Sequence, residues 1–459
     1  MLTFGIILAL VLGFLTVSLV STRFSWTEKI GLAFPVGMAV MTFIMVFLDT
    51  ICIKQQLSTI IPVSIALGLT FVSLLYRQGR LYTIFQPIHR FRLSKYNVVW
   101  LFFIIVICFY EYQNWTKCMY LPTFDNDSLC GFDTFGWVTA HENTYKGMSL
   151  FRTTYNARIH EAGSYINYAP FVQLSYAYVY LFGATMSKIV PAMMYVSLLI
   201  LFYALTRRIA GRTLASMTTL FMMLTPEMIA FSSLSATNVI HAYFASLGVL
   251  YLVLWWQSEE KHDLYMAFLL LAINMWTRTD GIVFLVSASM LVAFKALRTR
   301  RLRLLIPVGA AYIAPVYWAI YCKIYGLTCK TTAILSIFWD ADKADFICSR
   351  MSELLANNMF YGYTFYAMAL MIVVNLWFIL RYRDSLSLLF MFAMSLVLYC
   401  MALYQVNYIW DSIDNVLAYS AKRFLFCFVP LAWFYFATNK SMVWLFSKID
   451  AIIEAKGNH

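Results

Sequence analysis

The chain has 459 residues, of which 62% are hydrophobic and only 12% are charged. Soluble domains average about half apolar and about a quarter charged residues, so an ordinary soluble globule is excluded. The net charge of +12 does not indicate a nucleic-acid-binding protein. No basic stripe interleaved with aromatic residues occurs in a loop large enough to form such a domain.

Apolar runs long enough to cross about 30 Å of hydrocarbon recur along the whole chain, which predicts an all-α polytopic membrane protein. The first run lacks a basic leader and a small-residue cleavage motif, so we expect a retained span rather than a signal peptide. About 13 transmembrane helices are predicted, at residues 3–20, 30–48, 58–75, 97–113, 187–206, 214–232, 239–256, 264–277, 281–297, 304–322, 359–380, 385–402 and 421–438.

Basic loops predict the orientation of these spans, because cytoplasmic loops carry an excess of Lys and Arg. Four segments qualify, namely residues 76–96, 297–303 ("LRTRRLR"), 381–384 ("RYRD") and the tail 439–459. Placing all four in the cytoplasm gives one consistent threading, with the N-terminus outside. Three loops then face away from the cytoplasm: 114–165, 323–358 and 403–420.

The Tyr-rich segment 166–183 does not fit this threading as a full span. Counting it would push "RRIAGR", residues 207–212, to the outer side, against the charge rule. We therefore expect a juxtamembrane helix at the outer membrane surface, where tyrosines suit the headgroup layer. An ordinary span that violates the charge rule remains the alternative.

Three stretches carry a family resemblance: "DTFGWVTAHENTYKG" from Asp133 to Gly147, "HEAGSYINYAPF", and "ALTRRIAGRTLASMTTLFMMLTPEMIAFSSLSATNVIHAYFASLGVLYLVLWW". They resemble the GT-C glycosyltransferases, and within them the protein O-mannosyltransferase and aminoarabinose-transferase type. These polytopic enzymes take a sugar from a polyprenyl-phosphate donor on the outer membrane face. The sequence departs from the family pattern by having Asp133-Thr134 for the usual Asp-Glu pair and Ala169-Pro170 for the usual double Pro.

The resemblance implies a division of the chain into four regions. Residues 1–96 form three additional N-terminal helices and a basic loop, and 97–325 form the GT-C-like core with outer loop 114–165 and juxtamembrane helix 166–184. A second outer loop and the C-terminal helices occupy 326–438, and 439–459 form a cytoplasmic tail.

Transfer from a lipid phosphate requires a base for the acceptor hydroxyl, and one carboxylate suffices because the phosphate leaves as a stable anion. The spacing to Ala140 and Gly147 places Asp133 where the carboxylate of the resembling family falls. Asp127 and Asp125 are the further candidates for the base. The alternative for "DNDS" is a turn whose Asp and Asn side chains cap their own backbone.

Basic residues on the outer side require a reason, because they violate the charge rule. Lys422 and Arg423 lie at the start of the last predicted span, and Arg278 lies in the turn after 264–277. Arg suits bidentate phosphate contact, and the resembling family places an Arg near "KRFLFCFVP", so these residues are expected to bind the donor phosphate. The alternatives are a local pair of Arg278 with Asp280 and a headgroup anchor for Arg423.

Acceptor or sugar contacts are expected from four residues. Glu161 resembles a second acidic position of the family, with His160 beside it, and Trp339 and Asp340 offer an aromatic face and a carboxylate in the second outer loop. Metal dependence varies among GT-C enzymes, so no metal ligand is assigned and a divalent metal stays open. The polyprenyl-phosphate sugar is expected as a co-substrate.

The expected location is a bacterial inner membrane, with the active site on the periplasmic face. Sequons at Asn114 and Asn126 would carry glycans that crowd this site in the endoplasmic reticulum. The expected partners are the lipid-linked donor, membrane lipids and a glycan, lipid or protein acceptor of the cell envelope. An O-antigen-type polymerase or ligase and a lipid-linked oligosaccharide flippase or transporter remain the alternatives.

Overall fold

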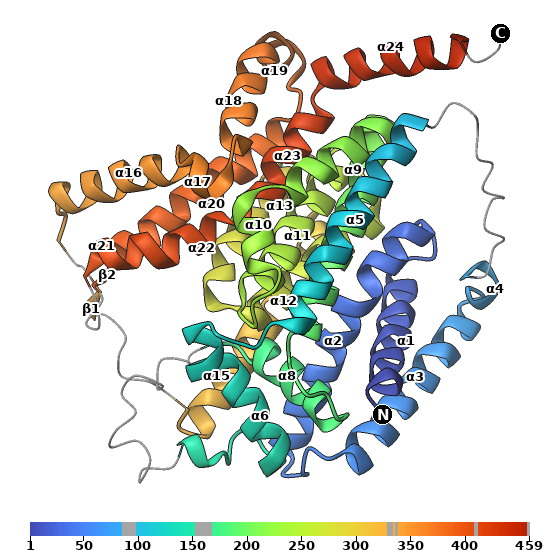
Figure 1. Cartoon of the computed structure of the whole chain (residues 1–459), viewed down its shortest axis with the longest axis vertical. Coiled ribbons are helices and arrows are strands. Elements are labelled where there is room, and N and C mark those ends of the chain that lie inside the picture. The colour runs from blue at the N-terminus through green and yellow to red at the C-terminus, as the bar shows by residue number, and fades with distance from the viewer. Residues whose placement is uncertain (85–97, 152–167, 328–333, 336–337, 408–411, 457–459) are drawn as a thin grey trace.

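The protein is described by a computed structural model that covers residues 1–459 except 85–97, 152–167, 328–333, 336–337, 408–411 and 457–459 (Figure 1). In the described chain, nine helices are long and apolar enough to cross a membrane, and counting two bent helix pairs as single spans gives eleven. The predicted polytopic helical architecture is therefore confirmed. The predicted count of about thirteen spans is not, and two segments account for the difference.

The first half of the described chain contains the N-terminal helices, the first long loop and a helical hairpin. Its elements are α1 (Leu2–Val20), α2 (Trp26–Thr50), α3 (Leu57–Arg77), α4 (Leu81–Ile84), α5 (Val98–Tyr120), η1 (Ser128–Phe132), α6 (Asp133–Glu142), η2 (Ser149–Phe151), α8 (Phe171–Leu181), α9 (Ile189–Met223) and α10 (Pro226–Phe231).

The second half is also helical, apart from one pair of two-residue strands. Its elements are α11 (Asn238–Ser258), α12 (Lys261–Thr277), η4 (Thr279–Gly281), α13 (Ile282–Thr299), η5 (Leu302–Leu304), α14 (Leu305–Ala311), α15 (Ile313–Ile324), β1 (Ile334–Leu335), α16 (Ala341–Leu355), α17 (Asn358–Tyr361), α18 (Thr364–Val374), α19 (Leu376–Tyr382), α20 (Leu386–Gln405), β2 (Val406–Asn407), α21 (Ile413–Val416), η6 (Leu417–Ala421), α22 (Lys422–Leu425), α23 (Phe428–Thr438) and α24 (Lys440–Lys456).

The first segment behind the different span count is α9, which folds back on itself at Gly211. This residue has φ 75° and ψ 178°, a conformation that glycine adopts without steric cost. The Tyr195 hydroxyl donates to the carbonyl of Met223 over 3.3 Å. In one straight helix these residues would stand about 42 Å apart at 1.5 Å per residue. Two antiparallel arms therefore flank the basic turn 207–212, in the places predicted for separate spans.

The second segment is α12, which has 17 residues. At 1.5 Å per residue it measures about 26 Å, slightly less than the hydrocarbon thickness. In the C-terminal tail, residues Lys440–Lys456 form the 17-residue helix α24.

Helices α1 and α2 pack backbone against backbone. A Cβ atom on Gly13 would lie 1.8 Å from the carbonyl oxygen of Ala33, and one on Gly37 would lie 1.9 Å from that of Ala9. Only small residues allow two helices to approach this closely, and close approach is how helices associate where lipid removes the hydrophobic driving force.

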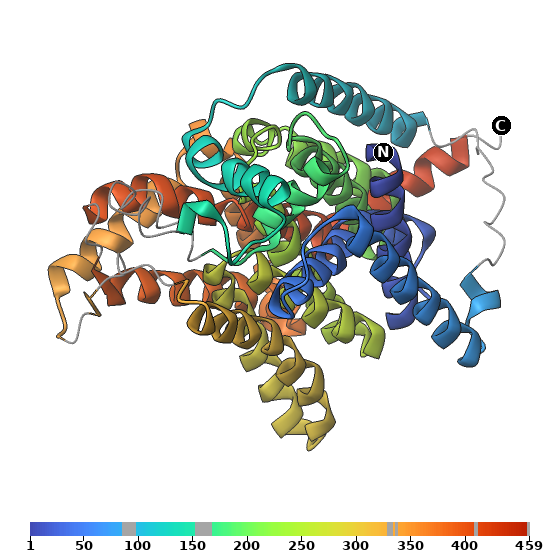
Figure 2. The ribbon, with the colours of Figure 1, turned by 90° about the horizontal axis from the view of Figure 1, so that it is seen from below.

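Helix α8 is the observed counterpart of the expected juxtamembrane helix. Its 11 residues span about 17 Å, too short to cross a bilayer. It differs from the expectation in its surroundings, because residues Phe171–Val179 are all buried. The tyrosines face protein rather than headgroups, and the Tyr178 hydroxyl donates to the Gly5 carbonyl over 2.7 Å. The helices α3 and α5, by contrast, lie at the edge of the bundle with few buried residues (Figure 2).

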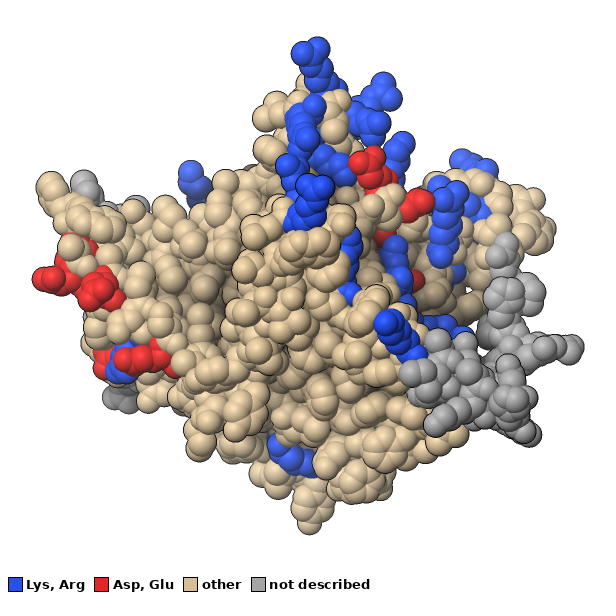
Figure 3. All heavy atoms as spheres, turned by 90° about the horizontal axis from the view of Figure 1, so that it is seen from above, with Lys and Arg blue, Asp and Glu red and all other residues tan. Residues whose placement is uncertain are grey.

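Charged residues gather at two opposite ends of the bundle. Helix α1 begins beside α8 and ends beside the ion pair of Arg23 with Glu260, so its length separates the two ends. We call the end with Arg23 the basic end, and Figure 3 shows Lys and Arg concentrated there. We call the opposite end, which carries residues 121–151, η4 and α22, the loop end.

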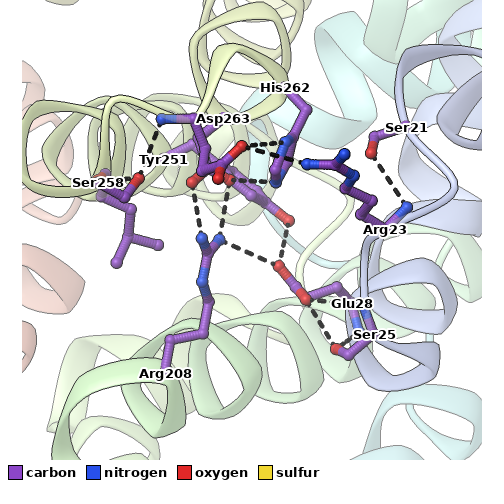
Figure 4. A network of polar contacts seen from close by, with 11 residues as sticks. Ser21, Arg23, Ser25, Glu28, Arg208, Tyr251, Ser258, His262 and Asp263 are labelled. Carbon is purple, nitrogen blue, oxygen red and sulfur yellow. Dashed lines mark hydrogen bonds and ion pairs between the residues drawn. The ribbon is translucent and has the colours of Figure 1, made fainter.

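A network of ion pairs closes the basic end (Figure 4). Arg208, in the turn of α9, forms two hydrogen bonds with Asp263 of α12, at 2.8 and 2.6 Å, and contacts Glu28 of α2 at 3.4 Å. Asp263 and Glu28 are buried, so their charges require this partner. The network joins three helices that are far apart in the sequence.

Candidate functional site

The carboxylate of Asp133 lies at the loop end, at the first position of α6. The π-helical turn η1 precedes it, and the Tyr180 hydroxyl of α8 donates to Asp133 Oδ1 over 2.6 Å. This contact depends on close packing of α6 on α8. A Cβ atom on Gly136 would lie 2.6 Å from the Cβ of Tyr176 and 2.9 Å from the carbonyl oxygen of Gln173, so only glycine fits there.

The surroundings of Asp133 suit a carboxylate that accepts a proton. The side chain is half-buried, and within the described chain Tyr180 is its hydrogen-bond donor, which leaves Oδ2 for another group. Burial raises the pKa of the Tyr180 phenol, as does its hydrogen bond to Asp133, so the phenol remains a donor. Tyr180 therefore orients Asp133 while Oδ2 stays open.

Asp127 and Asp125 take different roles in the same loop. Asp127 forms an ion pair with Arg423 of α22, 296 residues later in the chain, and the side chains are 23% and 27% exposed. Asp125 accepts from the backbone N–H and the hydroxyl of Ser128, at 3.1 and 2.9 Å. Asp125 thus caps its own turn, as the turn alternative described, whereas Asp127 ties the first loop to the last span.

Arg278 is engaged by its own turn. Its Nε and Nη2 donate to the two oxygens of Asp280 at 2.9 and 2.7 Å, and its Nη1 donates to Thr237 at 3.0 Å. All three nitrogens therefore have protein partners, in the local pairing that was the alternative to phosphate binding. Its guanidinium lies 5.6 Å from the centre of the Tyr168 ring, which itself lies 5.1 Å from that of Phe132. These rings connect Arg278 to the residue before Asp133.

Two buried polar residues, His241 and Asn274, lie beside the turn that holds Arg278, and they were not predicted from the sequence. His241 Nδ1 lies 2.7 Å from Asn274 Oδ1, and its Nε2 lies 3.9 Å from Asp280 Oδ1. His241 and Asn274 are almost completely buried on α11 and α12. A polar residue inside an apolar run was the available signal, but the sequence does not show that the two helices place these residues together.

Lys422 is also paired inside the protein. Its ammonium lies 3.0 Å from Glu227 of α10 and 4.2 Å from the ring centre of Phe360. This arrangement fixes α22 against α10 and α17, and of the two neighbouring cations it is Arg423 that contacts the first loop.

The other predicted contact residues lie elsewhere or outside the described chain. Trp339 is 77% exposed, and Asp340 caps α16 by accepting from the backbone N–H of Lys343 at 3.1 Å. Trp339 packs instead on Tyr404, with ring centres 5.1 Å apart. Glu161 and His160 fall in 152–167, outside the described residues. Among the residues that are described, no group of three or more His, Cys, Asp or Glu is arranged to hold a metal ion.

Two further charged residues organise the loop end. Lys188 is 1% exposed and donates to the carbonyls of Leu121 and Pro122 at 2.9 and 3.0 Å, and burial lowers its pKa. Asp49, 2% exposed at the end of α2, accepts from the hydroxyl of Thr144 at 2.8 Å and from the N–H of Lys146 at 2.9 Å. Charge at the end of an apolar run was the signal for both, and both fasten the first loop to the bundle.

Two contact pairs make up the candidate loop-end site, Asp133 with Tyr180 and Asp127 with Arg423. Asp127 and Asp133 are six residues apart in one continuous helical stretch, and the Tyr168 ring links Arg278 to Phe132 beside Asp133. Asp127 and Asp133 come from the first loop, Tyr180 from α8 and Arg423 from α22. Comparison of the chain with protein-family models, with curated proteins and with solved structures finds no match.

Proposed function

We propose that the protein is a membrane glycosyltransferase of the GT-C type, which moves a sugar from a polyprenyl-phosphate donor to a cell-envelope acceptor on the extracytoplasmic face. The observation that carries the proposal is the loop-end site. There a half-buried carboxylate with one open oxygen and a partly exposed arginine occur in the same corner of a polytopic protein. Glycosyl transfer from a lipid phosphate requires a base and a cation of this kind.

Asp133 is the general base of the proposed reaction. Its open oxygen takes the proton of the acceptor hydroxyl as the acceptor oxygen forms a bond to the anomeric carbon. The bond from that carbon to the phosphate oxygen breaks, and its electron pair leaves with the polyprenyl phosphate. Tyr180 acts as a positioning residue, because its hydrogen bond holds Oδ1 and directs the other oxygen outward.

Arg423 receives the donor phosphate. A guanidinium has five N–H donors, and the contact with Asp127 involves Nη1, so other donors remain for phosphate oxygens. Arg278 is less suited to this role, because Asp280 and Thr237 already occupy its Nε, Nη1 and Nη2. Lys422 is paired with Glu227 as Arg423 is with Asp127, but its single ammonium does not offer the bidentate contact of a guanidinium. The pair with Asp127 also keeps Arg423 oriented toward the loop before the donor arrives.

A flippase or transporter of lipid-linked oligosaccharides is the second candidate. Such proteins carry ionisable residues at membrane depth, and Glu111 lies inside α5 with both carboxylate oxygens buried. A transport path would place ionisable residues at membrane depth. The transferase is favoured because the ion pairs of the described chain lie instead at the two ends of the bundle. A polymerase or ligase uses a lipid diphosphate, so the chemistry of the bound lipid separates it from the transferase, which uses a monophosphate.

Binding of undecaprenyl monophosphate tests the assignment of Arg423. The purified protein is titrated with this lipid, and binding is followed by tryptophan fluorescence. We expect Arg423→Gln to weaken binding at least tenfold, and undecaprenol, which lacks the phosphate, not to compete. Arg350→Gln is the matched control, because Arg350 of α16 is another arginine paired with a carboxylate, Asp414 at 2.8 Å. Equal weakening in both variants, or none in Arg423→Gln, would remove the donor role of Arg423.

A further inference from the structure

A strongly basic cavity lies at the basic end, away from the loop-end site. It has a volume of about 590 Å³ and is formed where the α11–α12 turn meets the end of α13 and η5. Five cations and one carboxylate line it: Lys261, Lys295, Arg300, Arg301, Arg303 and Glu259.

The single carboxylate cannot balance these cations. Glu259 pairs with Lys295 at 3.0 Å and with Arg301 at 3.3 Å. Lys261, Arg300 and Arg303 form no ion pair with any described residue, which leaves three cations around one cavity without an anion. Like charges that converge in this way repel one another, so an anionic ligand would stabilise the arrangement.

A second cavity on the other side of the same turn makes the contrast clear. It measures about 570 Å³ and shares Glu259 and Lys261 with the basic cavity. Its cation Arg23 pairs with Glu260 at 3.6 Å, and His262 lies 3.5 Å from the same carboxylate (Figure 4). Arg80, whose Nη1 donates to the Leu19 carbonyl over 3.0 Å, also lines this second cavity. The second cavity therefore has two carboxylates among its lining residues, whereas the basic cavity has one carboxylate for five cations.

The rim of the basic cavity suits a lipid. Leu297, Leu302 and Ile306 are 70%, 63% and 67% exposed beside it, and they continue into the apolar surfaces of α13 and α14. Lys295 is held in the cavity wall, with its ammonium 4.7 and 4.9 Å from the ring centres of Trp255 and Trp256. A ligand with a phosphate head and hydrocarbon chains meets both surfaces at once.

We infer that this cavity binds the phosphate headgroup of an anionic membrane lipid, with Lys261, Arg300 and Arg303 as its phosphate ligands. Basic pockets between transmembrane helices bind such headgroups through charge and hydrogen bonds. The inference does not depend on the proposed transferase activity. A soluble phosphate compound shares the headgroup chemistry but would not use the exposed leucines and isoleucine.

The test uses the purified full-length protein and the variant Lys261→Gln/Arg300→Gln/Arg303→Gln. The control variant Arg77→Gln/Arg381→Gln/Lys448→Gln removes three exposed cations from other helices of the same end. Thermal unfolding is followed by tryptophan fluorescence with phosphatidylglycerol, phosphatidylcholine or inorganic phosphate added. We expect phosphatidylglycerol to raise the Tm of the wild-type and control proteins by several degrees and that of the cavity variant by less than a third as much.

Three outcomes would overturn the inference. These are an undiminished shift in the cavity variant, an equal shift with phosphatidylcholine, or an equal shift with inorganic phosphate, which would indicate a soluble anion instead. If the triple variant does not fold, the single variant Lys261→Gln replaces it, with Arg77→Gln as its control. A weakened response to phosphatidylglycerol in Lys261→Gln alone supports the site, and equal responses in both contradict it.

Discussion

Replacing Asp133 by Asn should abolish the proposed catalysis at the loop-end site while leaving the protein folded. Asn has the same shape and keeps an oxygen that accepts from Tyr180, whose hydroxyl lies 2.6 Å from Asp133 Oδ1. The half-buried side chain loses its charge, and the hydrogen bond changes from charge-assisted to neutral, a cost of about 1 kcal/mol in the free energy of unfolding. A general base contributes roughly 10²- to 10⁴-fold to the rate, or about 3 to 5 kcal/mol of transition-state stabilisation.

The assay follows release of polyprenyl phosphate in membranes that contain the protein and their own donor lipids. We expect Asp133→Asn to lower the rate at least 100-fold while Tm changes by only a few degrees. Tyr180→Phe is the control, because it removes the hydrogen bond but keeps the base, and it should lower the rate by about tenfold or less. Full activity in Asp133→Asn, or a larger loss in Tyr180→Phe than in Asp133→Asn, would refute the assignment of the base.

Three further predictions concern the fold and its orientation. Gly37→Ala should lower Tm by several degrees, since its Cβ would lie 1.9 Å from a carbonyl oxygen. Gly68→Ala should not lower Tm, because its Cβ would have its nearest contact at 3.4 Å. Equal Tm values for the two variants in thermal melts would contradict the packing of α1 on α2. Asp263→Asn should lower the free energy of unfolding in denaturant by about 3 kcal/mol, because it leaves Arg208 without its main partner, while Glu260→Gln at the exposed rim should cost less than about 1 kcal/mol. Cys52, exposed at the loop end, should react with a membrane-impermeant maleimide in intact cells. Labelling only after permeabilisation would show that the loop end faces the cytoplasm, opposite to the proposed orientation.

The sequence was sufficient for features that depend on local apolar runs. The predicted spans 30–48 and 385–402 correspond to Trp26–Thr50 and Leu386–Gln405, because an apolar run of this length has one stable form in lipid. The bends were not predicted. Thr364–Val374 and Leu376–Tyr382 meet at 58°, where the Asn375 side chain donates to Asp384 over 2.8 Å, and hydropathy alone does not register such a contact.

In the candidate site, too, the sequence predicted contacts between near neighbours but not contacts between distant residues. The pairing of Arg278 with Asp280 was identified as an alternative because the two residues are neighbours in the sequence. The contact of Asp127 with Arg423 and the hydrogen bond from Tyr180 to Asp133 join residues 296 and 47 positions apart. Such contacts depend on how helices pack, which a single sequence does not specify.

Mass spectrometry of the lipids that co-purify with the gently solubilised protein is the most direct test of the proposed function. The account predicts a polyprenyl monophosphate, bare or carrying one sugar, that is lost in Arg423→Gln. A polyprenyl diphosphate bearing an oligosaccharide would contradict it and would favour a polymerase, ligase or flippase.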